Sequence, residues 1–297
     1  MNLGEQILLK DFVNRDDELK EFCTVLDTKE HFIMIVCGTD GLGKTSLLTR
    51  LMYECGHQSR KLIKVADEGI GEYDYLMLMR QVVDAIGDKY FRPLNDLINF
   101  FTVPDYQPKI TLRLEGSIEV ANSAKFINST VGDIVGIKDL HLPPRSDMRV
   151  PEHERMTRLS KQFFADLRVA LEELRSELGN KPMVIFVDDV EKMTESTQTW
   201  IKATLLRSIL NDSLKDVKFV LGITSVPESD RLMQAITKVA TLKPFDEQRV
   251  IEYLNRRLKQ LDQGLIDMVV ANSEGLPLAI ANMTDAYLKK YPERRAN

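Results

Sequence analysis

The sequence has few cysteines and no long apolar segment. Only Cys23, Cys37 and Cys55 occur in 297 residues, and they do not show the paired spacing of a zinc site. We therefore expect free thiols, as in a reducing compartment, with Cys37 in the core. No run of about 18 apolar residues is present, and residues 1–6 lack the cationic start of a signal peptide. These absences predict a cytoplasmic protein without a membrane partner.

The chain also lacks an excess of positive charge. Lys and Arg number 40 against 45 Asp and Glu, which gives a net charge of −5 at pH 7. Because nucleic-acid-binding surfaces are usually basic, this balance does not favour nucleic acid as a partner, although a local basic patch is compatible with it. Internal repeats and low-complexity segments are missing as well. The length is sufficient for one large core or two smaller ones.

The most informative segment is residues 38–46, with the sequence GTDGLGKTS. It matches the phosphate-binding pattern G-x-x-x-x-G-K-[ST], and it lies between an apolar run at 32–37 and a helix-forming stretch at 46–52. Glycines there let successive backbone N–H groups face a phosphate, and the helix N-terminus adds partial positive charge. We predict that the nucleotide contacts Gly38, Asp40, Gly41, Leu42, Gly43, Lys44, Thr45 and Ser46.

Two side chains of this segment have specific expected roles. Lys44 should reach the outer phosphates as a mobile cation. The Thr45 hydroxyl should bind Mg²⁺, since this hard ion prefers oxygen ligands. The segment therefore predicts ATP or ADP together with Mg²⁺ as cofactors.

A second acidic motif follows the apolar run at 183–187. Buried parallel strands end where charges begin, so Asp188 and Asp189 are expected at the carboxyl edge of the sheet, beside the phosphate loop. Asp188 is predicted to hold Mg²⁺, and Asp189 to orient or deprotonate the attacking water. The next apolar run ends in Thr224 and Ser225, whose hydroxyls are expected to contact the γ-phosphate or that water.

Apolar runs alternating with helical patterns predict an α/β fold: a three-layer αβα P-loop NTPase with a parallel five-stranded core sheet. The expected nucleotide-binding domain is 1–244, with an insertion at about 88–150 that serves either as a structural elaboration or as a partner contact. Alternation at 110–120 predicts a hairpin in it. Helices at 247–261, at 265–271 and from 277 onward predict a helical lid bundle at 245–297.

Two further motifs carry a resemblance. Residues 12–19, FVNRDDEL, resemble F-V-G-R-x-x-E-L with Asn14 in place of Gly, and residues 275–278 match G-L-P-L. With the two motifs above, the chain resembles the STAND class of P-loop ATPases, a branch near AAA+. The resemblance implies that Val13 and Arg15 lie at the adenine and that Pro277 contacts the nucleotide. Val226 stands where the family's T-S-R motif has Arg.

The resemblance implies an ATPase that cleaves the β-γ phosphoanhydride slowly and acts as a signalling or defence switch. ADP holds a silent form, and ATP permits opening and homo-oligomerisation. Effector and sensor domains, usual in the family, are expected on a partner or on a longer chain. Arg207 or Arg231 is a candidate arginine finger, and the sequence does not choose between them.

Three other interpretations remain at this point. The first is an AAA+-type DNA-associated ATPase of the origin-recognition or transposition-regulator kind, which shares much of the motif pattern. The second is a metabolic P-loop kinase or transferase, which the acidic pair and the hydroxyl-ended strand do not favour. The third is a nucleotide-bound scaffold that does not hydrolyse ATP.

Overall fold

The computed structural model of the chain describes residues 9, 12–13, 15–28, 30, 32–57, 62–65, 74–102, 111–114, 118–121, 150–178, 181–210, 214, 216–226 and 231–296. The chain divides into two compact units, one of Met1–Ala85 with Glu173–Asn297 and one of Ile86–Glu172. Within the described ranges, no helix has the length and apolar character needed to cross a membrane.

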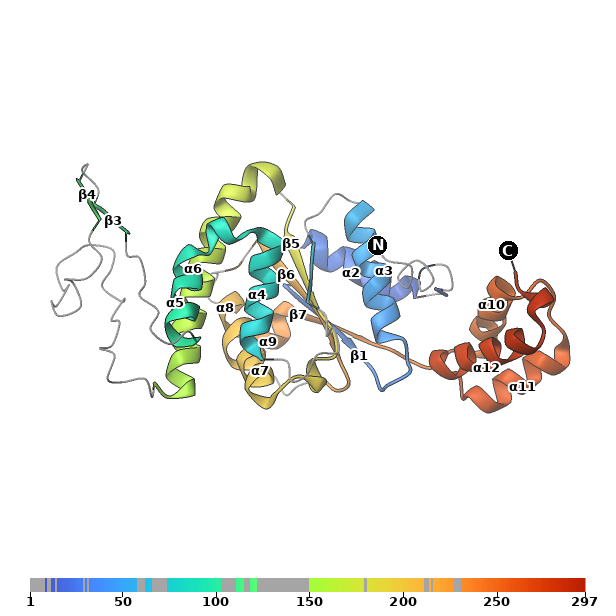
Figure 1. The fold of residues 1–297 in the computed structure, drawn as a ribbon. Coiled ribbons are helices and arrows are strands. Elements are labelled where there is room, and N and C mark those ends of the chain that lie inside the picture. Colours follow the sequence, from blue (N-terminus) through green and yellow to red (C-terminus); the bar gives the residue numbers. More distant parts are fainter. Residues whose placement is uncertain are drawn as a thin grey trace. The chain divides into compact units, whose positions relative to one another are not determined.

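A parallel sheet forms the centre of the first unit (Figure 1). Its strand order is β2-β5-β6-β1-β7, and every neighbouring pair is parallel. The central strands β1, β5 and β6 are entirely buried, which explains why they are apolar at every position except Lys218 of β6. The predicted parallel α/β fold is thus confirmed. The strands are β1 (Ile33–Cys37), β2 (Leu62–Val65), β5 (Met183–Val187), β6 (Val217–Ile223) and β7 (Thr237–Thr241).

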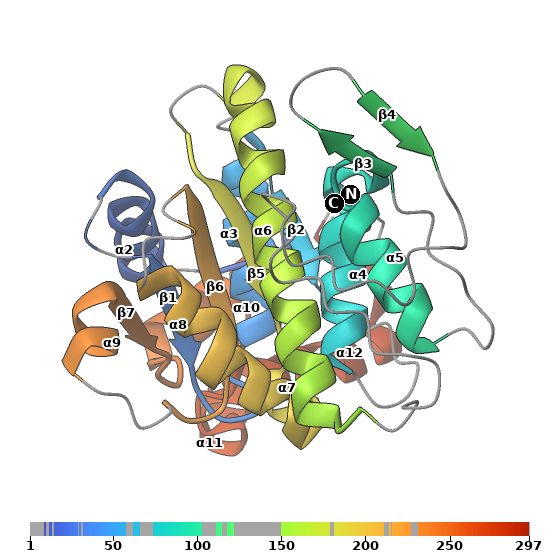
Figure 2. The same cartoon turned by 90° about the vertical axis from the view of Figure 1, so that its left-hand side faces the viewer.

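Helices lie on both faces of this sheet. One face packs its alternate residues, such as Met34, Phe186 and Val220, against α2 (Asp16–Asp27) and α3 (Lys44–His57). Figures 1 and 2 show α4 (Tyr75–Ile86), α7 (Glu195–Trp200) and α8 (Leu206–Leu210) on the opposite face. The rings of Tyr75 and Trp200 lie 6.4 Å apart there. A π-helical turn at Ile201–Leu205 joins α7 to α8.

Three C-terminal helices pack around a core of their own. They are α10 (Glu247–Arg257), α11 (Gln263–Ser273) and α12 (Pro277–Lys290), which follow α9 (Arg231–Ile236) and β7. Asp246 and Asp262 cap α10 and α11 through their carboxylates, and Pro277 occupies the first turn of α12. The prediction that the first of these helices reaches residue 261 is wrong. Leu258 is extended and pairs with Arg295, which ends α10 at Arg257.

The second unit contains α5 (Arg92–Thr102), most of α6 (Glu152–Leu178) and the short 3-10 helix η1 (Asp88–Tyr90). Phe91 stacks on Phe163 of α6 with ring centroids 6.1 Å apart. Strands β3 (Thr111–Leu114) and β4 (Ile118–Ala121) pair antiparallel, which confirms the predicted hairpin. Helix α6 is continuous over its 27 residues.

Asp166 on α6 is a buried carboxyl that makes stability depend on pH. Its Oδ2 accepts from the Leu94 backbone N–H at 3.0 Å, and its Oδ1 accepts from Gln162 Nε2 at 2.7 Å. Burial, partly offset by these two hydrogen bonds, raises the pKa of Asp166 from 3.8 to about 6. Because the folded pKa is the higher one, the carboxyl's contribution to stability is complete below pH 3.8 and is lost as the pH rises through about 6.

We expect Asp166→Asn to flatten this dependence, because the amide stays neutral and its oxygen still accepts from Leu94. At pH 7 the variant should be more stable than the parent by about 1–2 kcal/mol, a figure that allows for solvent screening. Urea denaturation at a series of pH values measures this difference. Glu172→Gln, at an exposed position of the same helix, is the control. An unchanged pH slope in Asp166→Asn would refute the assignment.

Candidate nucleotide-binding site

The phosphate loop turns the chain from β1 into α3. Gly41 and Gly43 adopt positive φ angles of 85° and 88°, a conformation that side chains other than glycine rarely adopt. Leu47 N–H donates to the Gly43 carbonyl at 2.9 Å, which fixes the first turn of α3. The loop therefore has the strand–loop–helix context that the sequence pattern predicts.

Lys44 is buried at the base of the loop. Its Nζ donates to the Gly38 carbonyl at 2.8 Å and to Asp40 Oδ1 at 3.3 Å. A third oxygen, Oε1 of Glu191, lies 3.7 Å away. Three oxygen atoms thus surround the ammonium group. Phosphate oxygens could replace these acceptors when a nucleotide binds.

Asp188 follows β5 directly and lies beside the start of α3. A hydrogen bond links its carboxylate with the Thr45 side chain, so the two predicted metal ligands lie together. Burial is the largest cause that raises the pKa of Asp188, and it outweighs the hydrogen bond from Thr45. Gly222 of β6 leaves the space that Asp188 occupies, since a Cβ there would lie 2.4 Å from Asp188 Oδ1.

Asp189 has a different environment from Asp188. Its backbone is left-handed, with φ 49° and ψ 42°, at the start of the 3-10 helix η4 (Val190–Lys192). Lys192 Nζ donates to Asp189 Oδ2 at 2.8 Å, and this hydrogen bond raises the pKa of Lys192. The side chain predicted to activate water is therefore already paired with a cation.

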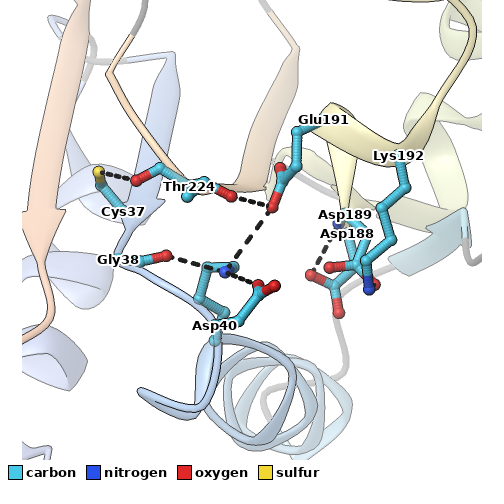
Figure 3. Close-up of polar contacts among 9 residues, drawn as sticks. Cys37, Gly38, Asp40, Asp188, Asp189, Glu191, Lys192 and Thr224 are labelled. Atoms are coloured by element: carbon cyan, nitrogen blue, oxygen red, sulfur yellow. Dashed lines mark hydrogen bonds and ion pairs between the residues drawn. The ribbon is translucent and has the colours of Figure 1, made fainter.

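Thr224 follows β6 and faces Glu191 (Figure 3). Its hydroxyl donates to Glu191 Oε1, and its backbone carbonyl accepts from Cys37 Sγ at 3.4 Å. The buried Cys37 agrees with its prediction as a core residue. Ser225, Arg207 and Arg231 are exposed.

Arg15 joins the N-terminal motif to the phosphate loop. Its Nη2 donates to the carbonyls of Leu42 and Lys243, each at 3.1 Å, and its Nη1 donates to Glu18 at 3.2 Å. The guanidinium also lies 5.0 Å from the ring centroid of Phe245. Arg15 is 5% exposed, and Val13 beside it is buried too. Asn14 lies outside the described residues.

The G-L-P-L segment contacts the phosphate loop. Leu278 N–H, in the first turn of α12, donates to the Gly41 carbonyl at 3.1 Å. A Cβ on Gly43 would lie 3.9 Å from Pro277. Motifs separated by more than 200 residues in the sequence are thus adjacent in the first unit.

A cavity of about 580 Å³ lies between these groups. Of the predicted nucleotide contacts, all line it except Gly38, and Asp189 lines it as well. Asp188, Thr224 and Ser225 are not among the lining residues. Eight further lining residues had no predicted role. Phe12 and Leu278 belong to the two motifs that carry the resemblance, and chain folding brings the other six to the cavity: Lys192, Phe245, Tyr253, Arg257, Ala281 and Asp285.

The C-terminal helices contribute a group of hydrogen-bonded polar side chains to the lining. Arg257 Nη1 donates to the Tyr253 hydroxyl at 2.9 Å, and its Nη2 donates to Asp285 Oδ1 at 2.7 Å. The volume and the combination of apolar and charged lining residues fit a small-molecule site. Beside the start of α3, the side-chain oxygens of Thr45 and Asp188 fit a hard divalent ion.

The parallel sheet, the phosphate loop and the acidic strand end together define an AAA-like P-loop ATPase domain. The chain belongs to a family described as an ATPase domain predominantly from Archaea, whose sequence model matches residues 12–282. Membership of this family implies nucleotide binding. No curated protein matches the chain in sequence.

Solved structures resemble the chain in fold. Cdc6p from Pyrobaculum aerophilum is 13% identical with a TM-score of 0.50, and the match covers 95% of this chain and 65% of that one. A STAND protein with a tetratricopeptide repeat sensor from Pyrococcus horikoshii is 13% identical with a TM-score of 0.47, covering 91% of this chain and 29% of that one. A RuvB variant from Thermotoga maritima is 12% identical with a TM-score of 0.43, covering 96% and 66%. The chain thus spans less than two thirds of each.

Proposed function

We propose that this domain is an ATP-binding, slowly hydrolysing switch of the STAND type, acting in signalling or defence. Helices α10–α12, from residue 245 onward, serve as a lid over the nucleotide, and residues 1–244 bind its phosphates. The nucleotide state then controls the position of the lid and the assembly of copies of the chain. The supporting observation is the hydrogen bond from Leu278 N–H to the Gly41 carbonyl.

That hydrogen bond couples lid and phosphate site directly. The Gly41 carbonyl belongs to the loop that must rearrange around phosphates, and Leu278 is in the first turn of the lid helix α12. Arg15 adds a second link, since one nitrogen donates to both Leu42 of the loop and Lys243 of the segment before the lid. A ligand that moves the loop therefore changes the contacts between loop and lid. A switch requires such a difference in contacts between its two nucleotide states.

The polar groups of the site divide between binding and hydrolysis. Lys44 exchanges its present acceptors for oxygens of the outer phosphates. Val13 and Arg15 lie at the adenine, and Pro277 contacts the nucleotide from the lid. Thr45 and Asp188 would hold Mg²⁺, which supplies charge neutralisation to the phosphates when bound. Asp188 is suited to this role because burial destabilises its negative charge, and a bound cation would offset that cost.

Lys44→Ala tests the phosphate site. Loss of a charged hydrogen-bond donor to phosphate should weaken ATP and ADP binding by about 10- to 100-fold. Titration with a fluorescent ATP analogue measures the dissociation constant, and Lys202→Ala at an exposed position is the control. Equal affinity in Lys44→Ala and the parent would refute this binding site.

The switch itself is tested by nucleotide content and mass. We expect the purified protein to carry ADP and to be monomeric, and to assemble only after exchange for Mg-ATP. Light scattering coupled to chromatography, with nucleotide extraction from each fraction, gives both values. Nucleotide-free protein that turns over rapidly, or that assembles only with added DNA, would instead support a DNA-associated AAA+ ATPase.

A further inference from the structure

Glu191 brings a second carboxylate to Lys44, and no motif of the sequence identifies it. Its Oε1 lies 3.7 Å from Lys44 Nζ. The other carboxylate near Lys44 belongs to Asp40, whose side chain is 82% exposed, whereas that of Glu191 is 31% exposed. Of the two carboxylates near Lys44, that of Glu191 is therefore the less exposed to solvent.

Thr224 fixes the orientation of Glu191. The Thr224 hydroxyl donates to Glu191 Oε1, and Thr224 is itself anchored where β6 ends, between the acidic strand β5 and the phosphate-loop strand β1. The two groups come from neighbouring strand ends and meet at the edge of the sheet that the phosphate loop also occupies (Figure 3). The same oxygen of the oriented carboxylate, Oε1, thus faces both the Thr224 hydroxyl and Lys44 Nζ.

The second carboxylate oxygen of Glu191 has capacity to accept a proton. Oε2 is buried and has no hydrogen-bond partner among the described residues. A buried oxygen without a partner carries a desolvation cost, which a bound water would relieve. Oε1 of the same carboxylate lies 3.7 Å from Lys44 Nζ, so Oε2 is one carboxyl group away from the cation expected to bind the outer phosphates, although Glu191 is not among the residues that line the cavity.

The carboxylate of Asp189 pairs with a different cation. Its Oδ2 accepts from Lys192 Nζ at 2.8 Å, and Figure 3 shows Asp189 beside Lys192 while Glu191 is directed at Thr224. The left-handed backbone at Asp189 starts η4, and this 3-10 turn carries both Glu191 and Lys192. The turn thus separates the two acidic side chains into different environments.

We propose that Glu191, rather than Asp189, is the catalytic carboxylate that activates the attacking water, an inference that rests on the proposed ATP hydrolysis. The water oxygen forms a bond to the γ-phosphorus while the bond from that phosphorus to the β-γ bridging oxygen breaks. The bridging oxygen leaves with the electron pair as part of ADP. The water proton passes to Glu191 Oε2 and from there to solvent, so ATP and water give ADP, inorganic phosphate and a proton. Thr224 is the positioning residue for this carboxylate.

The test compares Glu191→Gln with Asp189→Asn under single-turnover conditions. Loss of the proton acceptor in Glu191→Gln should slow ATP hydrolysis by about 10²- to 10³-fold, and Asp189→Asn should slow it by less than about tenfold. Glu195→Gln, exposed on α7, is the control for removal of a nearby negative charge. Nucleotide binding provides an independent measurement. Glu191→Gln should bind the ATP analogue about two- to fivefold more tightly, because no carboxylate competes for Lys44.

The outcomes separate this proposal from the proposed function. Slow hydrolysis with retained or tighter binding in Glu191→Gln supports the assignment and shows that the variant is folded. A loss in Asp189→Asn equal to or greater than that in Glu191→Gln overturns it. Weakened binding in Glu191→Gln, with a lowered melting temperature, also overturns it, since Glu191 would then be structural. If the parent protein neither binds nor cleaves ATP, the proposed function itself fails.

Discussion

Gly222→Ala is expected to reduce ATP hydrolysis by about 10²-fold, although residue 222 never touches the nucleotide cavity. A Cβ at this position would lie 2.4 Å from Asp188 Oδ1 and 2.9 Å from Leu48 Cδ1. Leu48 is packed in the core against the sheet, so the carboxylate is the group that must move. Moving it breaks its hydrogen bond with Thr45 and separates the two oxygens that would hold Mg²⁺.

Phosphate release at saturating Mg-ATP measures this effect. The matched control is Gly56→Ala, in α3, because a Cβ there meets no described atom within 4 Å. We expect the control to retain its activity. The melting temperature should fall only modestly in Gly222→Ala, since overpacking of this kind costs about 1–3 kcal/mol. Hydrolysis within threefold of the parent would show that Asp188 is not required where the structure places it.

Gly275→Ala is expected to destabilise the C-terminal helices more than any other single change considered. Gly275 has a φ of 71°, and an added Cβ would lie 2.2 Å from the carbonyl oxygen of Phe245. That approach is fixed by the hydrogen bond from Phe245 N–H to the Gly275 carbonyl, at 2.7 Å. The backbone strain and the clash together should cost about 3 kcal/mol.

Thermal unfolding should show a loss of about 6–12 °C, and nucleotide affinity should fall with it because Pro277 and Leu278 follow directly. Glu274→Gly is the opposite case at the neighbouring position. Glu274 has a φ of 51°, which glycine adopts without strain, so this substitution should raise stability by a few tenths to about 1 kcal/mol. Stability of Gly275→Ala equal to that of the parent would refute the described turn.

Local patterns predicted most of the secondary structure correctly. Whole buried strands such as β1 and β5 are apolar at every position, and the long α6 has a continuous apolar stripe, so both signals are strong. The errors occur where contacts with residues distant in the sequence determine the end of an element. Leu258 fits a helical pattern, yet it pairs with Arg295, and the helix ends before it.

The candidate site was predictable where its residues are contiguous. The loop at 38–46 carries its chemistry in its own spacing, because the backbone N–H groups, Lys44 and Thr45 are all local to one turn. The acidic pair at 188–189 was predictable in position but not in arrangement. Nothing in the spacing distinguishes an aspartate that contacts Thr45 from one that pairs with Lys192.

The sequence alone determined the class of this protein, a P-loop ATPase domain with a parallel sheet, since a phosphate loop and buried strands are encoded by residues next to each other. Only the tertiary structure decided which groups meet. It brought Glu191 and Thr224 to Lys44, placed Arg15 between the loop and Lys243, and opened space for Asp188 at Gly222. These contacts join residues that are remote in the chain, and their geometry depends on strand order and helix packing rather than on local residue spacing.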